Sequence, residues 1–194
     1  MYLSGEEYLS FGSYFLVLGT LISAIGETMQ GSDLKNINKK LIRDGNAVQA
    51  LGNSLQGFGR IRLTEKIEED SHLYGIIGCF MQAGGNTINS AASNIEIENP
   101  SPAITRFNSV GSSVQSMGAA LEAAGEANRE SDHLNNLEVL GSSLISVAAM
   151  LDSAGILIRD EMSIQKRLLL ATGGWLEFIG ASIGAYAISK RGTA

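Results

Sequence analysis

The sequence predicts an all-α protein of six tandem antiparallel helices, arranged as three helical hairpins in an up-down bundle or array. Two observations predict this fold. Glycine or alanine recurs at seven-residue steps in six separate places, and the first members of these six sets lie 33, 33, 33, 30 and 32 residues apart. Self-similarity at a fixed period is typical of repeat architectures. We therefore expect residues 1–194 to form a single repeat domain of six helical units, each about 33 residues long.

The small residues that recur at heptad steps are called the ridge positions below. Fifteen of these 18 positions are glycine and three are alanine, whereas a chain with 23 glycines in 194 residues would place about two there by chance. They are Gly12, Gly19, Gly26, Gly45, Gly52, Gly59, Gly78, Gly85, Ala92, Gly111, Gly118, Gly125, Gly141, Ala148, Gly155, Gly173, Gly180 and Ala187.

Glycine at these positions indicates a close approach between helices. Each glycine inside a helix costs roughly 0.5–1 kcal/mol relative to alanine, so 15 of them need a compensating contact. A neighbouring helix lying against the ridge, near the short end of the usual spacing, supplies one. Bulky residues flank the ridge, such as Phe15, Tyr74 and Phe107, and we expect them to interdigitate as in a coiled coil. Hinges in flexible segments are the alternative, but hinges do not hold heptad register.

Breakers and capping residues divide the repeat into helices. Ser4 and Glu7 match a capping box, and Ser101 followed by Pro102 fits an N-cap with proline at the first helical position. Residues 31–33 and 128–132 are polar or glycine-containing breaks, whereas residues 60–71 and 159–163 are charged but weaker stop signals. The predicted helices are 5–30, 34–59, 66–95, 102–128, 133–159 and 163–190.

The first and last helices are the most apolar, which leaves the closure of the bundle open. Residues 8–26 contain no charge, and residues 168–189 contain only Glu177. The end units of an open array are expected to be polar on their outer faces. Either the first helix packs on the sixth, or both meet a partner, another copy of the chain, or a lipid bilayer.

Composition excludes some classes of partner. The net charge is −6, and the densest basic stretches, residues 35–43 and 166–167, lack interleaved aromatic residues. A phosphate-binding surface needs clustered Lys and Arg, so we expect no nucleic-acid binding. Cys79 is the only cysteine, so an internal disulfide is impossible, and we interpret it as a small core residue. The acidic start of the chain does not resemble a signal peptide, and a cytoplasmic location is expected by default.

No constellation of catalytic or metal-ligating residues is visible, so we expect no enzyme activity, no catalytic, cofactor-binding or metal site, and no cofactor. His72 and His133 lie about 60 residues apart in or near loops, and the Gly84-Gly85 and Gly173-Gly174 pairs belong to the ridge. Glu122, Asp152 and Glu177 each follow a ridge position by four residues. That repetition favours a structural role at the edge of the seam, although the three carboxyl groups, if buried together, could form an ion or proton site.

Two functions fit these patterns. The first is a non-enzymatic structural or self-associating protein, whose partner is itself, bound through the apolar first and last helices. The second is a membrane-associated protein that inserts the same two helices, because windows of about 20 apolar residues can span a bilayer and small residues suit helix packing in lipid. Against full insertion, the second to fourth units carry many Asn, Gln and Ser, and the mean hydropathy is only +0.10.

The repeated unit also resembles a known type of sequence. Residues 45–52 read GNAVQALG and residues 111–118 read GSSVQSMG. This Gly-x-x-aliphatic-x-x-x-Gly style is similar to an uncharacterised family of repetitive glycine-rich helical proteins from Bacillus and related spore-formers. The resemblance covers nearly the whole chain. It implies a bacterial source, and it implies no activity and no site residues.

Overall fold

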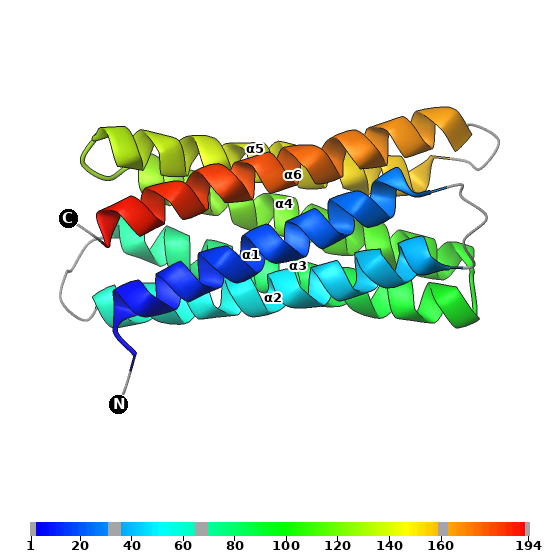
Figure 1. Cartoon of the computed structure of the whole chain (residues 1–194), viewed down its shortest axis with the longest axis horizontal. Coiled ribbons are helices and arrows are strands. Elements are labelled where there is room, and N and C mark those ends of the chain that lie inside the picture. Colours follow the sequence, from blue (N-terminus) through cyan, green and yellow to red (C-terminus); the bar gives the residue numbers. More distant parts are fainter. Residues whose placement is uncertain (1–2, 31–35, 65–69, 159–162, 193–194) are drawn as a thin grey trace.

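A computed structural model describes residues 3–30, 36–64, 70–158 and 163–192, and the account below concerns these residues. They form six long helices and no strand, as predicted (Figure 1). The helices are α1 (Gly5–Thr28), α2 (Ile37–Thr64), α3 (Asp70–Glu98), α4 (Pro102–Ala127), α5 (His133–Leu157) and α6 (Ser163–Arg191).

The predicted caps are confirmed. Ser4 and Glu7 form a reciprocal capping box at the start of α1, which satisfies two of the backbone N–H groups that a helix N-terminus leaves free. The hydroxyl of Ser101 accepts a hydrogen bond from the N–H of Ile104, with Pro102 at the first helical position. At the start of α5, the carboxylate of Asp132 accepts from the N–H of Asn135 at 2.6 Å.

The predicted boundaries of α2 and α3 are wrong by three to five residues, and the largest difference is at the end of α2. We placed Arg60 at the start of a charged gap, but α2 continues to Thr64. Arg60 is buried and its guanidinium is paired inside the molecule, so it belongs to a helix face rather than to a solvated connection. The predicted break at residues 31–33 lies outside the described residues, as does most of residues 159–163.

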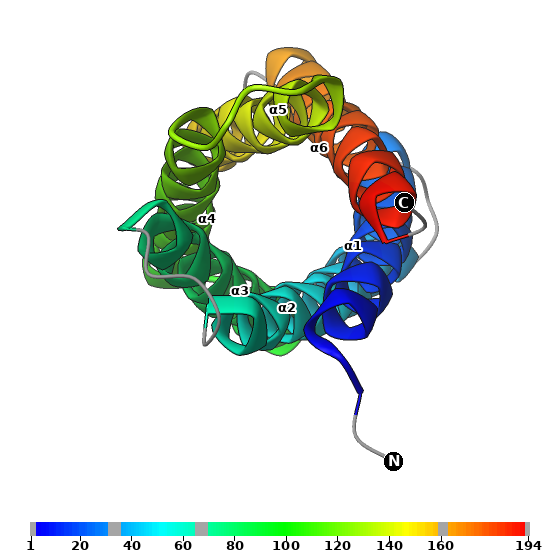
Figure 2. The ribbon, with the colours of Figure 1, turned by 90° about the vertical axis from the view of Figure 1, so that its left-hand side faces the viewer.

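The six helices close into a ring. Each helix packs against its neighbours in sequence, and α1 packs against α6. Figure 2 shows this ring end on, with α1 beside α6 and both chain termini at the same end. The indole N–H of Trp175 donates to the Thr28 hydroxyl at 3.0 Å near one end of the α1–α6 contact, and Tyr14 hydrogen-bonds Ser189 near the other. An open array is therefore excluded.

The ridge glycines bring the two helices of each hairpin into backbone contact. A Cβ atom built at Gly12 of α1 would lie 2.6 Å from the carbonyl oxygen of Gly52 in α2, and one built at Gly78 of α3 would lie 2.6 Å from that of Gly118 in α4. All 18 ridge positions are buried. Gly84 is an exception to the predicted ridge, because it is exposed and a Cβ built there would meet nothing within 4 Å.

The distribution of polar and apolar side chains is inverted relative to an ordinary water-soluble bundle. The predicted interdigitation is wrong in detail, because Phe15, Tyr74 and Phe107 are exposed and the other bulky residues beside the ridges are only partly buried. Among the described residues, the buried large aliphatic side chains are Leu16, Ile145 and Leu170, whereas Gln49, Gln82, Glu126, Asn53 and Asn86 are among the largest fully buried side chains. The interior of the ring is mostly polar, apart from a small apolar cluster that includes Leu16 and Ile145, and the exterior is mostly apolar.

Candidate functional site in the barrel interior

The interior side chains occupy two fixed places in the repeat. They lie one and four residues after a ridge position, because these places turn toward the ring axis when the ridge itself faces the neighbouring helix. In α2 to α4 they are mostly polar, and all are buried except Leu63, Glu96 and Arg129, which lie at or just beyond the helix ends and are half-buried. They include Asn46, Gln49, Asn53, Gln56, Gln82, Asn86, Asn89, Ser112, Gln115 and Glu122.

The middle of the interior contains amide groups that need further partners. Asn53 of α2 and Asn86 of α3 are fully buried, and neither the oxygen nor the nitrogen of either side chain makes a hydrogen bond within the protein. Buried polar groups are nearly always hydrogen-bonded, to protein or to ordered water. Because both donors and acceptors are unsatisfied here, internal water molecules fit these positions best.

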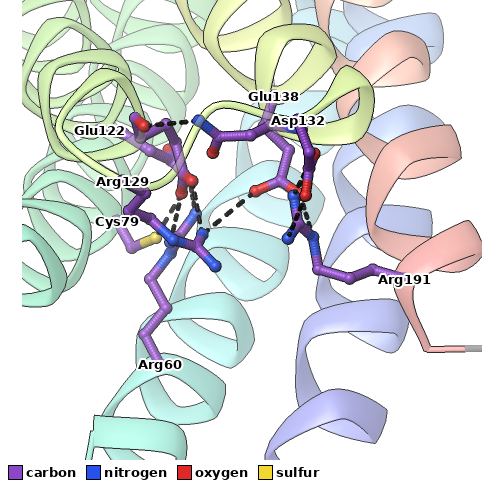
Figure 3. A network of polar contacts seen from close by, with 9 residues as sticks. Arg60, Cys79, Glu122, Arg129, Asp132, Glu138 and Arg191 are labelled. Atoms are coloured by element: carbon purple, nitrogen blue, oxygen red, sulfur yellow. Dashed lines mark hydrogen bonds and ion pairs between the residues drawn. The ribbon is translucent and has the colours of Figure 1, made fainter. Parts of the chain in front are cut away.

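The end of the barrel that holds the chain termini contains an arginine–carboxylate network (Figure 3). The guanidinium of Arg60 donates to Glu122 at 2.5 Å and to Glu126 at 2.6 Å, both on α4. The buried Sγ of Cys79 lies 3.7 Å from the Glu122 carboxylate. A buried ion pair gives little net stability, but it leaves an uncompensated charge if one partner is removed. Arg60 therefore neutralises two acidic groups that this part of the interior could not hold alone.

Two further arginines extend the network to α5 and α6. Arg129 donates to Glu126 at 2.6 Å and lies 3.6 Å from Glu138, and Arg191 donates to Glu138 at 3.0 Å. Arg191 also lies 3.4 Å from the exposed Asp132. The hydrogen bond from the Asn135 N–H, with the charge of Arg191, holds the pKa of Asp132 below its ordinary value. Three arginines thus pair with the four acidic residues of this network, Glu122, Glu126, Asp132 and Glu138.

The opposite end of the barrel holds a cavity of about 120 Å³, which is large enough for several water molecules. It lies where α1, α3 and α5 end and α2, α4 and α6 begin, and its lining comes from all six helices. Three buried acidic residues, Glu27, Asp152 and Glu177, line it and interact electrostatically with one another. Lys39 and Glu96, paired at 3.2 Å and partly exposed, form part of its outer lining.

Adjacent glycines of α6 make room for two of these carboxyl groups. The carboxyl group of Asp152, on α5, lies against Gly173, and that of Glu27, on α1, lies against Gly174. A methyl group at either glycine would overlap the carboxylate oxygen. Glu177, one turn further along α6, accepts a hydrogen bond from the Gln115 amide, whose nitrogen is also 3.5 Å from the Gln49 oxygen. The chain Gln49–Gln115–Glu177 connects the cavity to the middle of the interior.

The structure separates the three acidic residues that the sequence grouped. Asp152 and Glu177 lie in the cavity, whereas Glu122 belongs to the Arg60 network at the other end. All three are buried rather than at the edge of a seam. His72 and His133 lie in the first turns of α3 and α5, next to the connections, and Cys79 is fully buried, as predicted.

Sequence reasoning missed Glu27, Arg60, Glu126 and Glu138. A signal was available for the first three, because each directly follows a ridge glycine. The same register holds Asn46, Asn53 and Asn86. If the positions directly after the ridge glycines had been interpreted as one interior surface, these residues would have been identified as part of it. Glu138 precedes the first ridge glycine of its unit by three residues and carries no such mark.

The fold and its interior define a class: a closed six-helix barrel with a polar, partly charged interior and an apolar exterior. Residues 7–185 match a family of unknown function, DUF6944, and the chain belongs to this family. Neither the curated proteins nor the solved structures contain a match to this chain.

Proposed function

We propose that this protein is a non-enzymatic, membrane-embedded helical barrel, which holds a polar interior across the apolar layer of a bilayer. The observation that carries the proposal is an exterior belt on which the described residues expose no charged side chain. It runs through the middle of all six helices, and charged residues stand at its two edges. All charged side chains within the belt's span are buried in the ring.

The height of this belt matches a bilayer. On α2 the exposed charges Asp44 and Arg62 are separated by 18 residue steps, or about 27 Å at the rise of an α-helix. On α6 Arg167 and Lys190 are separated by about 34 Å on the same basis. The hydrocarbon core of a bilayer is about 30 Å thick. Between the two edges the exposed side chains include Leu51, Phe58, Ile77, Phe80, Val110, Met117, Val147, Met150, Trp175 and Ile179.

The polar residues of α2 to α4 do not oppose this proposal. By length and hydropathy α1, α5 and α6 are apolar enough to cross a membrane. A hydropathy average counts both faces of a helix, so the interior Asn, Gln and Glu of α2 to α4 lower it although they face away from the exterior. Ionisable residues in membrane helices typically face the interior of a bundle or a water-filled cavity. We therefore propose insertion of the whole ring rather than of the first and last helices alone.

Self-association is the second candidate, because an exposed apolar surface in water needs a cover. The sequence led us to expect that a second copy of the chain binds the first and last helices. To cover the whole apolar surface, that copy would have to reach the exterior of every helix. A symmetric interface between two copies buries one patch on each. Lipid covers a continuous belt on all sides, and this favours the membrane. The bacterial source that the sequence resemblance implies also remains a prediction.

Fractionation tests the proposal. The full chain is expressed without detergent, and membranes are collected by ultracentrifugation and washed with high salt and with alkaline carbonate. We expect the protein to remain in the pellet after both washes and to dissolve in a mild detergent as a monodisperse species. Recovery in the supernatant as a defined oligomer would instead support the self-associating protein and overturn membrane insertion.

A further inference from the structure

We propose that basic side chains on the exterior of the cavity end bind the anionic phospholipid headgroups of the cytoplasmic leaflet, so that the cavity end faces the cytoplasm and the chain termini lie on the opposite side of the membrane. This inference rests on the proposed membrane location. It adds the orientation of the barrel and the class of lipid that the barrel meets.

The exposed basic residues of the cavity end stand at one level of the ring and are called the basic collar below. They are Lys40 on α2, Arg106 on α4 and Arg167 on α6. Each follows the first residue of its helix by three or four positions, which is about 4.5–6 Å at the rise of an α-helix. Because these helices alternate with α1, α3 and α5 around the ring (Figure 2), the three charges are distributed around the barrel. The collar therefore borders the apolar belt, where headgroups would meet it.

The opposite end of the barrel offers less positive charge to lipid. Among the described residues, the basic side chains that are exposed or half-exposed at that end are Arg62, Arg129, Lys190 and Arg191. Arg129 and Arg191 pair with buried carboxylates of the interior network. The other two each lie over a tyrosine ring. By contrast, neither Lys40 nor Arg106 has an acidic partner in the described part of the chain, so the collar is available to an external anion.

Helix stability does not explain the collar. The macrodipole of a helix favours acidic side chains near its N-terminus and disfavours basic ones. α1 follows this preference with Glu6 and Glu7 in its first turn, and α5 follows it with Asp132 as its N-cap. The helices α2, α4 and α6, which begin at the cavity end, have no acidic residue in the first turn and carry the collar instead. A partner outside the helices accounts for this placement.

The distribution of basic residues along the chain indicates the orientation. Lys and Arg close to membrane helices favour the cytoplasmic side, Asp and Glu contribute little, and the first helix usually dominates. Residues 1–7, before α1 enters the belt, contain no Lys or Arg, whereas residues 29–43 after it contain four. The cytoplasmic leaflet also carries the anionic lipids that attract basic segments. Both rules place the collar on the cytoplasmic side.

Cysteine labelling tests the orientation in spheroplasts of a bacterial host that expresses the full chain. Ala103→Cys adds a thiol at an exposed position of the cavity end, and Ser131→Cys adds one at an exposed position of the opposite end. We expect a membrane-impermeant maleimide to label Ser131→Cys in intact spheroplasts and Ala103→Cys only after lysis. Reversed labelling, or equal labelling of both before lysis, would overturn the orientation. The wild-type chain is the control, because its only cysteine, Cys79, is fully buried.

Neutralising the collar tests whether its charge sets the orientation. The collar variant replaces three exposed basic residues and combines Lys40→Gln, Arg106→Gln and Arg167→Gln. With Ala103→Cys added, we expect labelling before lysis to rise from background to about a tenth of the total or more. The matched control combines Asp44→Asn with Glu98→Gln, which removes exposed acidic charge at the same end, and should leave labelling at background. Background labelling of the collar variant, or equal labelling of both sets, would contradict the role of the collar.

The class of lipid is tested on the full chain purified in a mild nonionic detergent. We expect phosphatidylglycerol to raise the thermal unfolding midpoint and phosphatidylcholine to leave it unchanged. The collar variant should need about tenfold more phosphatidylglycerol, or more, for the same shift. An equal response to the two lipids, or an unchanged response of the collar variant, would overturn headgroup binding by the collar.

Failure of the membrane location and failure of this inference give different results. A protein that is not inserted would be recovered in the supernatant after lysis, with both added cysteines protected in intact spheroplasts and both labelled after lysis, and the two proposals would fall together. A barrel inserted the other way would stay in the washed membranes and reverse the labelling, so only the orientation would fail. If the collar variant does not insert, the labelling of Ala103→Cys and Ser131→Cys and the lipid response of the wild-type chain still decide.

Discussion

Gly85 of α3 lies against Gly111 of α4 so closely that a methyl group at Gly85 would come within 2.6 Å of the Gly111 carbonyl oxygen. Its sequence neighbour Gly84 is exposed, and a methyl group there would meet nothing within 4 Å. The two glycines share a helix and a local sequence, but one is an interhelical contact and the other is not. They form a matched pair for testing the ridge.

We expect Gly85→Ala to destabilise the fold by about 1–3 kcal/mol, because α3 and α4 must move apart to admit the methyl group. Gly84→Ala should stabilise it by about 0.5–1 kcal/mol, the usual gain for replacing an exposed helical glycine. Urea unfolding followed by circular dichroism measures both changes. Equal effects of the two substitutions would show that the ridge is not a backbone contact.

Larger side chains on the ridge should be worse. A Cβ at Gly52 would lie 2.7 Å from the Gly12 carbonyl oxygen, and one at Gly118 the same distance from that of Gly78. We expect Gly52→Leu and Gly118→Leu to lower the thermal midpoint strongly, since overpacking a close-packed contact forces the backbone apart. An unchanged midpoint would contradict the close approach of α1 to α2 or of α3 to α4.

The heptad glycines were enough to predict the helices and the hairpins. Small residues at a fixed period have one simple structural explanation, which is close contact with a neighbouring backbone. Helix starts could also be predicted, because a capping residue such as Ser101 acts on the backbone next to it. Closure of the ring could not be derived, because the contact between α1 and α6 joins segments far apart in sequence. Its residues Gly174 and Glu27 each directly follow a ridge glycine, but that register does not indicate which two helices meet.

The site was harder to predict than the fold because its residues resemble ordinary surface residues. A Gln or Asn on a helix is usually exposed, so the Asn and Gln residues of the second to fourth units were interpreted as evidence against full membrane insertion. Only their constant offset from the ridge distinguishes an interior position from an exterior one. The sequence did not predict that the arginines pair with acidic residues at one end of the barrel only. The pairing of Arg60 with Glu122 and Glu126 depends on how α2 and α4 are arranged within the ring.

Removing Arg60 should be strongly destabilising. Arg60→Met leaves the buried Glu122 carboxylate without its arginine and leaves Glu126 with Arg129 alone, and breaking a buried ion pair from one side costs about 3–5 kcal/mol. Lys40→Met, on the exposed face of the same helix, should change stability by no more than about 0.5 kcal/mol. Both are measured by chemical unfolding.

A double variant separates lost charge compensation from lost packing. Adding Glu122→Gln to Arg60→Met removes the carboxylate that has lost its arginine, so we expect it to recover part of the lost stability. The same Glu122→Gln change in the wild-type background should be destabilising, because it weakens the pair with Arg60. An additive loss in the double variant would mean that Arg60 acts through its bulk rather than its charge.

Gly174 of α6 should be intolerant of substitution for a different reason than the hairpin ridges. A methyl group there would meet the Glu27 carboxylate and come within 3.0 Å of the Ala24 backbone. We expect Gly174→Ala to destabilise the protein by about 1–3 kcal/mol by spreading α1 from α6. Gly184→Ala, in the same helix but with no atom within 4 Å of the added group, should be neutral or stabilising by up to about 1 kcal/mol. The measurement is the thermal unfolding midpoint. Equal midpoints for the two variants would show that α1 and α6 are not in contact at Gly174.

A charge on the exterior belt distinguishes lipid from water as its surroundings. Met117 lies near the middle of α4 and is 60% exposed. In a bilayer, Met117→Lys places a charge near the hydrocarbon centre at a cost of about 2.5–3.5 kcal/mol, so the amount of protein recovered from washed membranes should fall several-fold. In water the same substitution changes stability by about 0.5 kcal/mol or less and should improve solubility. Met117→Leu controls for the loss of the methionine and should behave as wild type in both cases. A normal membrane yield for Met117→Lys would argue that this part of the belt does not face acyl chains.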